Sequence, residues 1–319
     1  MIVLDSHCDS PSQMFRLRDF GLDNVWGQVD FPKMKRGEVD ASFFALYTSN
    51  ELSDSQAYAL AMRMLGMLEG QVAANPDKVA FARSSADVRR NKEKGLISIM
   101  IGMENGTPLM ERLDRLEYFH NRGVLYLTLT HNGDNFICDS CAGNHKWGGL
   151  SPFGREVVAE MNRIGMLIDV AHISDESFWD VIKYSTKPVV STHSCCRALA
   201  DRPRNMTDEM IKALADNGGV IQINFYPYFL DGNYNDGDLV RPSYKRIVDH
   251  IDHVVQLVGV EHVGLGSDFD GIDHTPEGVD SVADLPKVLL ELKSRGYSKN
   301  DISKIAGENF LRVLDIVTK

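Results

Sequence analysis

Cysteine is scarce in this sequence, and its occurrences are odd in number and unevenly spaced. The five cysteines are Cys8, Cys138, Cys141, Cys195 and Cys196. This pattern does not fit a disulfide framework and favours reduced thiols. Cys138 and Cys141 have the Cys-x-x-Cys spacing of half a zinc site or of a redox pair, but the sequence has no second such pair and no thioredoxin-like context. We therefore expect them to be loop thiols.

Basic residues are also in deficit, since 34 Lys and Arg stand against 45 Asp and Glu and give a formal net charge of −11. No window carries the basic stripe that binding to a phosphate backbone requires, so nucleic acid is not expected as a partner. Long apolar runs are missing as well. The segment Ile2–His7 enters a strand-like pattern at once, so neither a signal peptide nor a membrane span is predicted. We expect a cytoplasmic protein with no membrane partner.

Linkers, internal repeats and low-complexity segments do not interrupt the chain, which predicts a single catalytic domain over residues 1–319. Short aliphatic runs alternate with longer stretches of helical spacing, which is typical of parallel βα units. The predicted strands are Ile2–Asp5, Ala41–Tyr47, Ile97–Gly102, Val124–Leu129, Met166–Val170, Val189–Thr192, Val220–Phe225 and Val263–Gly266. The predicted helices cover residues 53–74, 109–122, 153–164, 175–184, 207–216, 243–258, 281–295 and 298–316.

Eight such units in right-handed succession predict an α/β protein with the (β/α)₈ TIM-barrel fold, and a doubly wound open sheet is the alternative. Residues 11–39, 132–150 and 227–242 fit no βα unit. We interpret them as loops over the catalytic face that shape a substrate pocket, or as a small accessory element.

Residues that can bind metals follow six of the predicted strands. They are His7, Asp9, Glu104, His131, His172, His193, Asp268 and Asp270. In a parallel barrel the carboxyl ends of the strands share one rim, so these side chains should converge there. A single histidine near a strand end is usually structural, but six strands that bring such residues to one rim predict a metal centre.

The number of ligands favours two metal ions, because one catalytic zinc needs only three protein ligands and a water. We expect His7, Asp9 and Glu104 to hold one ion, and Glu104, His172 and His193 to hold the other, with Glu104 as the bridge. The ions would share a nucleophilic hydroxide. Zinc suits these ligands, although ligand type leaves manganese and iron open. Asp268 would act as general acid and base, and His131 would polarise the substrate carbonyl.

The same residues lie in short strings that together resemble the membrane dipeptidase (renal dipeptidase) family of amidohydrolase-type barrels. The strings are Asp5-Ser6-His7-Cys8-Asp9, Ile101-Gly102-Met103-Glu104, Leu129-Thr130-His131-Asn132, Gly149-Leu150-Ser151-Pro152-Phe153-Gly154, Asp169-Val170-Ala171-His172-Ile173-Ser174, Ser191-Thr192-His193-Ser194, Pro203-Arg204-Asn205 and Gly266-Ser267-Asp268-Phe269-Asp270-Gly271. Each string alone is weak evidence, but their order from residue 5 to about residue 315 is specific.

The resemblance implies a binuclear zinc site with the ligands given above. It further implies that His131 contacts the scissile carbonyl, that Asp268 transfers protons and binds the substrate amine, and that Arg204 binds the substrate carboxylate. A guanidinium suits that last role because it can form two parallel hydrogen bonds. Tyr47 and Tyr226 match positions that line the family's pocket. The chain more closely resembles soluble microbial members, and a homodimer is expected by resemblance alone.

We therefore predict a zinc-dependent dipeptidase that hydrolyses the peptide bond of dipeptides through a metal-bridging hydroxide. One alternative keeps the metal site but changes the substrate to N-acyl amino acids, β-lactams or lactones. A second alternative is a metal-binding protein without turnover, which the presence of Asp268 and His131 beyond the ligands disfavours.

Overall fold

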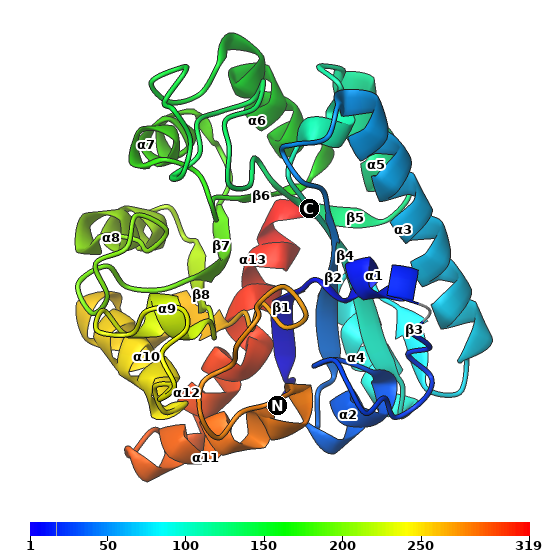
Figure 1. Ribbon diagram of the computed structural model, residues 1–319, viewed down its shortest axis with the longest axis vertical. Coiled ribbons are helices and arrows are strands. Elements are labelled where there is room, and N and C mark those ends of the chain that lie inside the picture. The colour runs from blue at the N-terminus through cyan, green and yellow to red at the C-terminus, as the bar shows by residue number, and fades with distance from the viewer. Residues whose placement is uncertain (17) are drawn as a thin grey trace.

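The computed structural model describes residues 1–16 and 18–319, and a ring of parallel strands forms its centre (Figure 1). The order of the hydrogen-bonded strands is β1-β2-β4-β5-β6-β7-β8-β9, and β3 pairs with β4 outside this path. The strands are β1 (Leu4–Cys8), β2 (Ala41–Tyr47), β3 (Val79–Phe81), β4 (Ile97–Glu104), β5 (Val124–Thr128), β6 (Leu167–Asp169), β7 (Val190–Ser194), β8 (Val220–Ile223) and β9 (Val263–Leu265).

The first and last strands of this path come together at their carboxyl ends. The amide of Asp9 donates to the carbonyl of Phe269 at 2.9 Å, and the amide of Asp268 donates to the carbonyl of His7 at 3.1 Å. These bonds continue the parallel pairing between β1 and the segment after β9 and leave a nearly closed barrel. The predicted (β/α)₈ fold is confirmed, and the open sheet is excluded.

Helices surround the strands and lie between them in the chain. They are α1 (Ser10–Gln13), α2 (Phe31–Arg36), α3 (Asp54–Ala74), α4 (Ser85–Glu93), α5 (Leu113–Asn121), α6 (Pro152–Ile164), α7 (Asp175–Tyr184), α8 (Asp208–Asp216), α9 (Pro227–Leu230), α10 (Lys245–Val258), α11 (Leu285–Ser294), α12 (Lys299–Ser303) and α13 (Asn309–Val317). Ser53, Ser151, Ser174 and Thr207 each accept a hydrogen bond from a backbone amide in the first turn of the following helix. Their hydroxyls satisfy donors that have no partner within the helix, which explains why these helices begin where the sequence predicts.

Three parts of the fold differ from the sequence prediction. The unit formed by β3 and α4 was not predicted, because β3 has only three residues and its pattern is too short to read. The predicted helix 298–316 is divided into α12, a π-helical turn (Lys304–Glu308) and α13. Strands β1 and β7 extend further than predicted, so His7 and His193 lie within strands and not after them. Among residues 1–16 and 18–319, no helix combines the length and apolarity needed to cross a bilayer.

Strand register places four residues at one level of the rim. Tyr47 pairs with Glu104, Glu104 with Thr128, and Thr128 with Asp169 on successive strands. Below this level a hydrophobic cluster joins the strands to α13, which the ring of strands surrounds in Figure 1. Phe43 is central to the cluster, because its ring lies 5.2 Å from that of Phe310 and 5.1 Å from that of Tyr126. The packed interior gives the rim a rigid base.

Candidate active site

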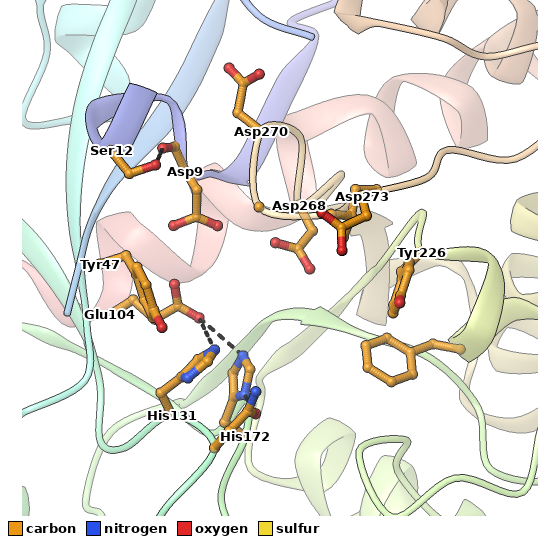
Figure 2. A pocket seen from close by; sticks show the side chains of 14 residues that line it. Asp9, Ser12, Tyr47, Glu104, His131, His172, Tyr226, Asp268, Asp270 and Asp273 are labelled. Carbon is orange, nitrogen blue, oxygen red and sulfur yellow. Dashed lines mark hydrogen bonds and ion pairs between the residues drawn. The ribbon is translucent and has the colours of Figure 1, made fainter. Parts of the chain in front are cut away.

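The carboxyl rim of the barrel surrounds a cavity of about 310 Å³. Figure 2 shows side chains from several strands directed into it. The residues that line it are Asp9, Ser12, Tyr47, Glu104, His131, Asn132, His172, Tyr226, Phe229, Asp268, Asp270, Gly271, Ile272 and Asp273. His7 and His193 lie at its base, where both are fully buried.

Glu104, the last residue of β4, is at the centre of the cluster. Its Oε1 lies 3.0 Å from Nε2 of His172 and 3.5 Å from Nε2 of His193, and its Oε2 lies 3.4 Å from Nε2 of His7. Asp9 Oδ2 is also 3.4 Å from Nε2 of His7. The structure thus brings together all five residues that were predicted as metal ligands, with imidazoles on both sides of one carboxylate.

His131 and Asp268 lie at the edge of the same cluster. His131 Nε2 is 3.9 Å from Glu104 Oε1, and Asp268 Oδ1 is 4.0 Å from His7 Nε2. Ligand atoms within 4.8 Å of one another form three groups that could hold a metal: His7 with Asp9 and Glu104, Glu104 with His131 and His172, and His7 with His193 and Asp268. His131 and Asp268 are therefore close enough to act on anything bound at the centre.

Two buried atoms in the cluster have no hydrogen-bond partner among the described residues: Nε2 of His7 and Oδ1 of Asp9. An unpaired buried polar atom is costly unless a ligand completes it. Two of the nearby imidazoles are also kept neutral, since burial, Arg204 and the neighbouring histidines hold the pKa values of His172 and His193 well below their usual range. Burial also opposes protonation of His7, but the carboxylates of Glu104 and Asp9 outweigh it and raise the pKa of His7, so a positive charge is favoured at this point. Neutral imidazole is the form that binds a metal, so the residues fit a metal centre.

Each of the three central histidines contacts a second polar group through its Nδ1. The partners are the hydroxyl of Tyr126 for His7 (2.8 Å), Oδ1 of Asn132 for His172 (3.0 Å) and the hydroxyl of Thr192 for His193 (2.8 Å). Such partners fix the ring orientation and direct Nε2 toward the centre, where the Nε2 atoms of His172 and His193 lie 2.9 Å apart. The sequence prediction did not assign these partners. Asn132 and Thr192 carried a signal, because each stands beside a histidine in one of the strings, whereas Tyr126 lies in none of them.

Two residues of the cluster, like several loop residues elsewhere, have a left-handed backbone conformation. His172 and Asp268 have φ values of 68° and 64°, in the left-handed region that side chains disfavour. Strain of this kind costs about 1–3 kcal/mol per residue and is typical of functional sites. Close packing accompanies it, because a Cβ on Gly271 would lie 2.1 Å from Oδ2 of Asp9 and 2.7 Å from Oδ1 of Asp268. Only glycine fits between these carboxylates.

Burial shifts the pKa values of His131 and Asp268, the two acid–base candidates, in opposite directions. Burial lowers the pKa of His131 to about 4, and the positive charge of Arg204 lowers it further while Asp9 opposes the shift. Burial raises the pKa of Asp268 to about 7. The ring of His131 is thus neutral at pH 7, whereas the carboxyl of Asp268 lies close to its midpoint.

The remaining predicted residues occupy different positions. Tyr47 and Tyr226 line the cavity, and the ring of Tyr47 packs edge-on against His131 at 4.8 Å. Arg204 does not belong to the cavity lining. It lies almost buried behind the cavity, where it donates to the Ser194 hydroxyl and to the His193 carbonyl, both at 2.8 Å.

Asp270 was predicted at the rim with Asp268, but the structure gives it a partner in the first loop. Its carboxylate accepts two hydrogen bonds from Arg18 at 3.0 Å, one from the amide of Gln28 at 2.7 Å and one from the hydroxyl of Ser10 at 2.6 Å. This buried ion pair joins the loop after β1 to the loop after β9.

Cys138 and Cys141 are free thiols, as expected. Burial raises the pKa of both thiols and so disfavours the reactive thiolate. The metal-capable groups found among residues 1–16 and 18–319 contain no cysteine.

A parallel barrel with imidazoles and carboxylates gathered at its carboxyl rim, around an open cavity, defines a metal-dependent hydrolase. Comparison with known proteins identifies the group. The profile of the family described as Membrane dipeptidase (Peptidase family M19) matches residues 1–319. The chain therefore belongs to the membrane dipeptidase family of metallo-dipeptidases, as its sequence strings indicate.

Individual relatives agree with this assignment. The chain is 36% identical to the dipeptidase aclJ of Aspergillus oryzae over 95% of this chain and 73% of the relative. Among solved structures, it is similar to the probable dipeptidase PvdM of Pseudomonas aeruginosa (TM-score 0.92, 27% identity, 100% of this chain and 96% of that chain). It is equally similar to a metallopeptidase of Rhodobacter sphaeroides liganded with a phosphinate mimic of L-Ala-D-Ala (TM-score 0.92, 26% identity, 99% of each chain).

Proposed function

We propose that this chain hydrolyses dipeptides with the help of two zinc ions at the barrel rim. The observation that carries the proposal is the position of Glu104, whose two oxygens face His172 and His193 on one side and His7 on the other. A carboxylate flanked by two sets of ligands suits a pair of cations, because its negative charge offsets their repulsion.

His7, Asp9 and Glu104 would hold one ion, and Glu104, His172 and His193 would hold the other. The unpaired Nε2 of His7 and Oδ1 of Asp9 fit this arrangement. The bound ions would supply a water of lowered pKa and polarise the scissile carbonyl. Imidazole and carboxylate ligands favour zinc.

Asp268 and His131 would act on the substrate itself. Asp268, with its pKa raised to about 7, suits a group that takes a proton from the attacking water and delivers it to the leaving amine. Its ionised form would also attract the free amine of the substrate. His131 would donate a hydrogen bond to the carbonyl oxygen as negative charge develops there.

The ends of the substrate would be recognised by charge. Asp268 would bind the amine, and Arg204 would bind the carboxylate through N–H groups that Ser194 and the His193 carbonyl leave free. Tyr47 and Tyr226 would line the space between them. The dipeptide mimic bound by the related Rhodobacter sphaeroides protein supports a substrate of this size.

The test is a spectrophotometric screen of a dipeptide library, L,D pairs included, on zinc-reconstituted protein with Asp268→Asn as control. We expect hydrolysis of several dipeptides and a loss of about 10²- to 10⁴-fold in kcat in the variant, the usual contribution of a positioned acid–base group. No activity above the variant on any dipeptide would contradict the mechanism. Faster turnover of a neutral ester than of every dipeptide would contradict the substrate class.

A single domain, a homodimer and a cytoplasmic location stay predictions from the sequence.

A further inference from the structure

The cavity wall contains a carboxylate that the proposed mechanism does not use. Five carboxylates line the cavity. Asp9, Glu104 and Asp268 belong to the central cluster, and Asp270 is paired with Arg18. The fifth, Asp273, forms no ion pair or side-chain hydrogen bond with any residue in the described ranges 1–16 and 18–319. An unpaired negative charge therefore remains on the wall of the pocket.

The position of Asp273 relates it to one end of the substrate. Asp273 lines the cavity together with Asp268, and Figure 2 shows its carboxylate on the side where Tyr226 lies. Burial, the hydrogen bond to Asp236 and the charges of Asp236 and Asp273 all raise the pKa of Tyr226, which is consistent with this proximity. Because Asp268 is the proposed binding partner of the substrate amine, the first residue is the part of the substrate that this side of the wall would meet.

Aromatic side chains complete this part of the wall. The rings of Tyr226 and Phe229 are 5.1 Å apart and nearly perpendicular, at 86°, and both line the cavity. Aromatic faces attract cations, and the aliphatic stem of a lysine or arginine packs well against them. The guanidinium of Arg204 already lies 5.7 Å from the Phe229 ring, so the carboxylate of Asp273 and the ring of Tyr226 are the groups that suit a flexible cationic side chain.

We propose that Asp273 is a specificity residue that favours dipeptides whose first residue carries a cationic side chain, such as lysine, ornithine or arginine. This inference rests on the proposed function, because it uses Asp268 to orient the substrate. The preference acts on binding of the side chain and requires no change in the chemistry at the metal centre.

The test compares substrates that differ only in charge. Lysyl-alanine and norleucyl-alanine have side chains of similar length, and alanyl-lysine with alanyl-norleucine moves the same difference to the second residue. We expect the kcat/KM ratio of lysyl- to norleucyl-alanine to be about five- to tenfold, the range of a solvent-accessible ion pair reinforced by an aromatic face. The ratio should decrease with added salt, and the second-residue pair should give a ratio near one.

Asp273→Asn should bring the first-residue ratio to about one and leave kcat/KM for norleucyl-alanine within about twofold. Asp273→Lys should instead favour glutamyl-alanine. Glu277→Gln is the matched control, because Glu277 lies on the same loop, is exposed and does not line the cavity. It removes an equal charge and should leave the ratio unchanged.

The inference would be overturned by a wild-type ratio near one, by an unchanged ratio in Asp273→Asn, or by an equal decrease in Glu277→Gln. A preference confined to the second residue would also overturn it. Each of these leaves the dipeptidase activity intact. Failure of the proposed function has a different signature, since norleucyl-alanine and all other dipeptides would then remain unhydrolysed.

Discussion

Replacing Thr192 by valine should weaken metal binding although Thr192 is not itself a ligand. Its hydroxyl lies 2.6 Å from Oδ2 of Asp169 and 2.8 Å from Nδ1 of His193. A hydroxyl has a single hydrogen and an ionised carboxylate can only accept, so Thr192 donates to Asp169 and accepts from His193. The proton of His193 is thereby held on Nδ1. Its Nε2, which lies 2.9 Å from Nε2 of His172 and 3.5 Å from Oε1 of Glu104, then presents a lone pair to the centre.

The size of the effect follows from what valine removes. Valine keeps the shape but not the hydroxyl, so His193 loses the group that fixes its tautomer. Loss of such an outer partner lowers metal affinity about 10- to 100-fold, or about 1.4–2.7 kcal/mol. The fold also loses a hydrogen bond to a buried carboxylate, which costs about 1–3 kcal/mol of unfolding free energy.

Thr128 offers a matched control that separates these two effects. Its hydroxyl donates to the same oxygen of Asp169 at 2.5 Å but does not contact His193. In urea unfolding of metal-free protein, both Thr128→Val and Thr192→Val should lose stability through the missing hydrogen bond to Asp169, and Thr192→Val should lose more because Nδ1 of His193 also loses its partner. In competition with a zinc chelator, only Thr192→Val should show the decrease in affinity, and Thr192→Ser should restore it. Equal zinc affinities in the two valine variants would refute the tautomer argument.

Three further outcomes are expected. Chelation of the metal should abolish dipeptide hydrolysis and lower the melting temperature, because zinc at about 1,000 times its Kd stabilises the fold by about 4 kcal/mol. Added zinc should restore both the activity and the melting temperature. A chelated protein that keeps full activity would contradict a metal mechanism. Burial lowers the pKa of His250 to about 4, so as pH falls the imidazole of His250 is protonated in the unfolded chain before it is protonated in the folded protein. The free energy of unfolding should therefore decrease by about 3 kcal/mol between about pH 6.5 and about pH 4. In metal-free protein, His250→Asn should lose this part of the pH dependence, and an unchanged slope would contradict it. Asp270→Asn leaves the buried charge of Arg18 uncompensated and should lower the free energy of unfolding, measured by urea titration, by about 3–5 kcal/mol. Asp273 is exposed, so Asp273→Asn should leave the free energy of unfolding nearly unchanged in the same measurement.

The barrel was predictable because its elements are long or clearly patterned. Helix α7 occupies the predicted residues, and its start is fixed by the Ser174 cap. The break between α12 and α13 was not predictable, because its cause is tertiary. A Cβ on Gly307 would lie 2.9 Å from Cβ of Leu4, so the chain at this turn packs directly on β1. A periodic pattern of side chains carries no trace of such a contact.

The site also contains residues that could be predicted from the sequence and residues that could not. Its central residues could be predicted because histidine and carboxylate types at strand ends are unusual, and parallel strands bring their ends to one rim. Their partners could not be predicted, since Tyr126, Thr192 and Asp169 are of types that also occur in ordinary cores and turns. Arg204 shows the limit most clearly. Its residue type indicates a group that binds a carboxylate, but its hydrogen bonds to the Ser194 hydroxyl and the His193 carbonyl, which fix its position, could not be predicted.

The loop after β9 combines three roles within a few residues. Asp268 is the proposed acid–base group, Asp270 anchors the loop to Arg18, and Asp273 is the proposed specificity residue. Loops are more mobile than the elements that they connect, and functional residues on them depend on a rigid scaffold. The buried pair of Asp270 and Arg18 attaches this loop to the loop after β1. Dipeptide hydrolysis and the preference for a cationic first residue should therefore both depend on the ion pair of Asp270 and Arg18. In Asp270→Asn, kcat and the lysyl-to-norleucyl ratio should decrease together, whereas Asp273→Asn should change only the ratio. A variant at Asp270 that lost one property and kept the other would show that the loop is held in some other way.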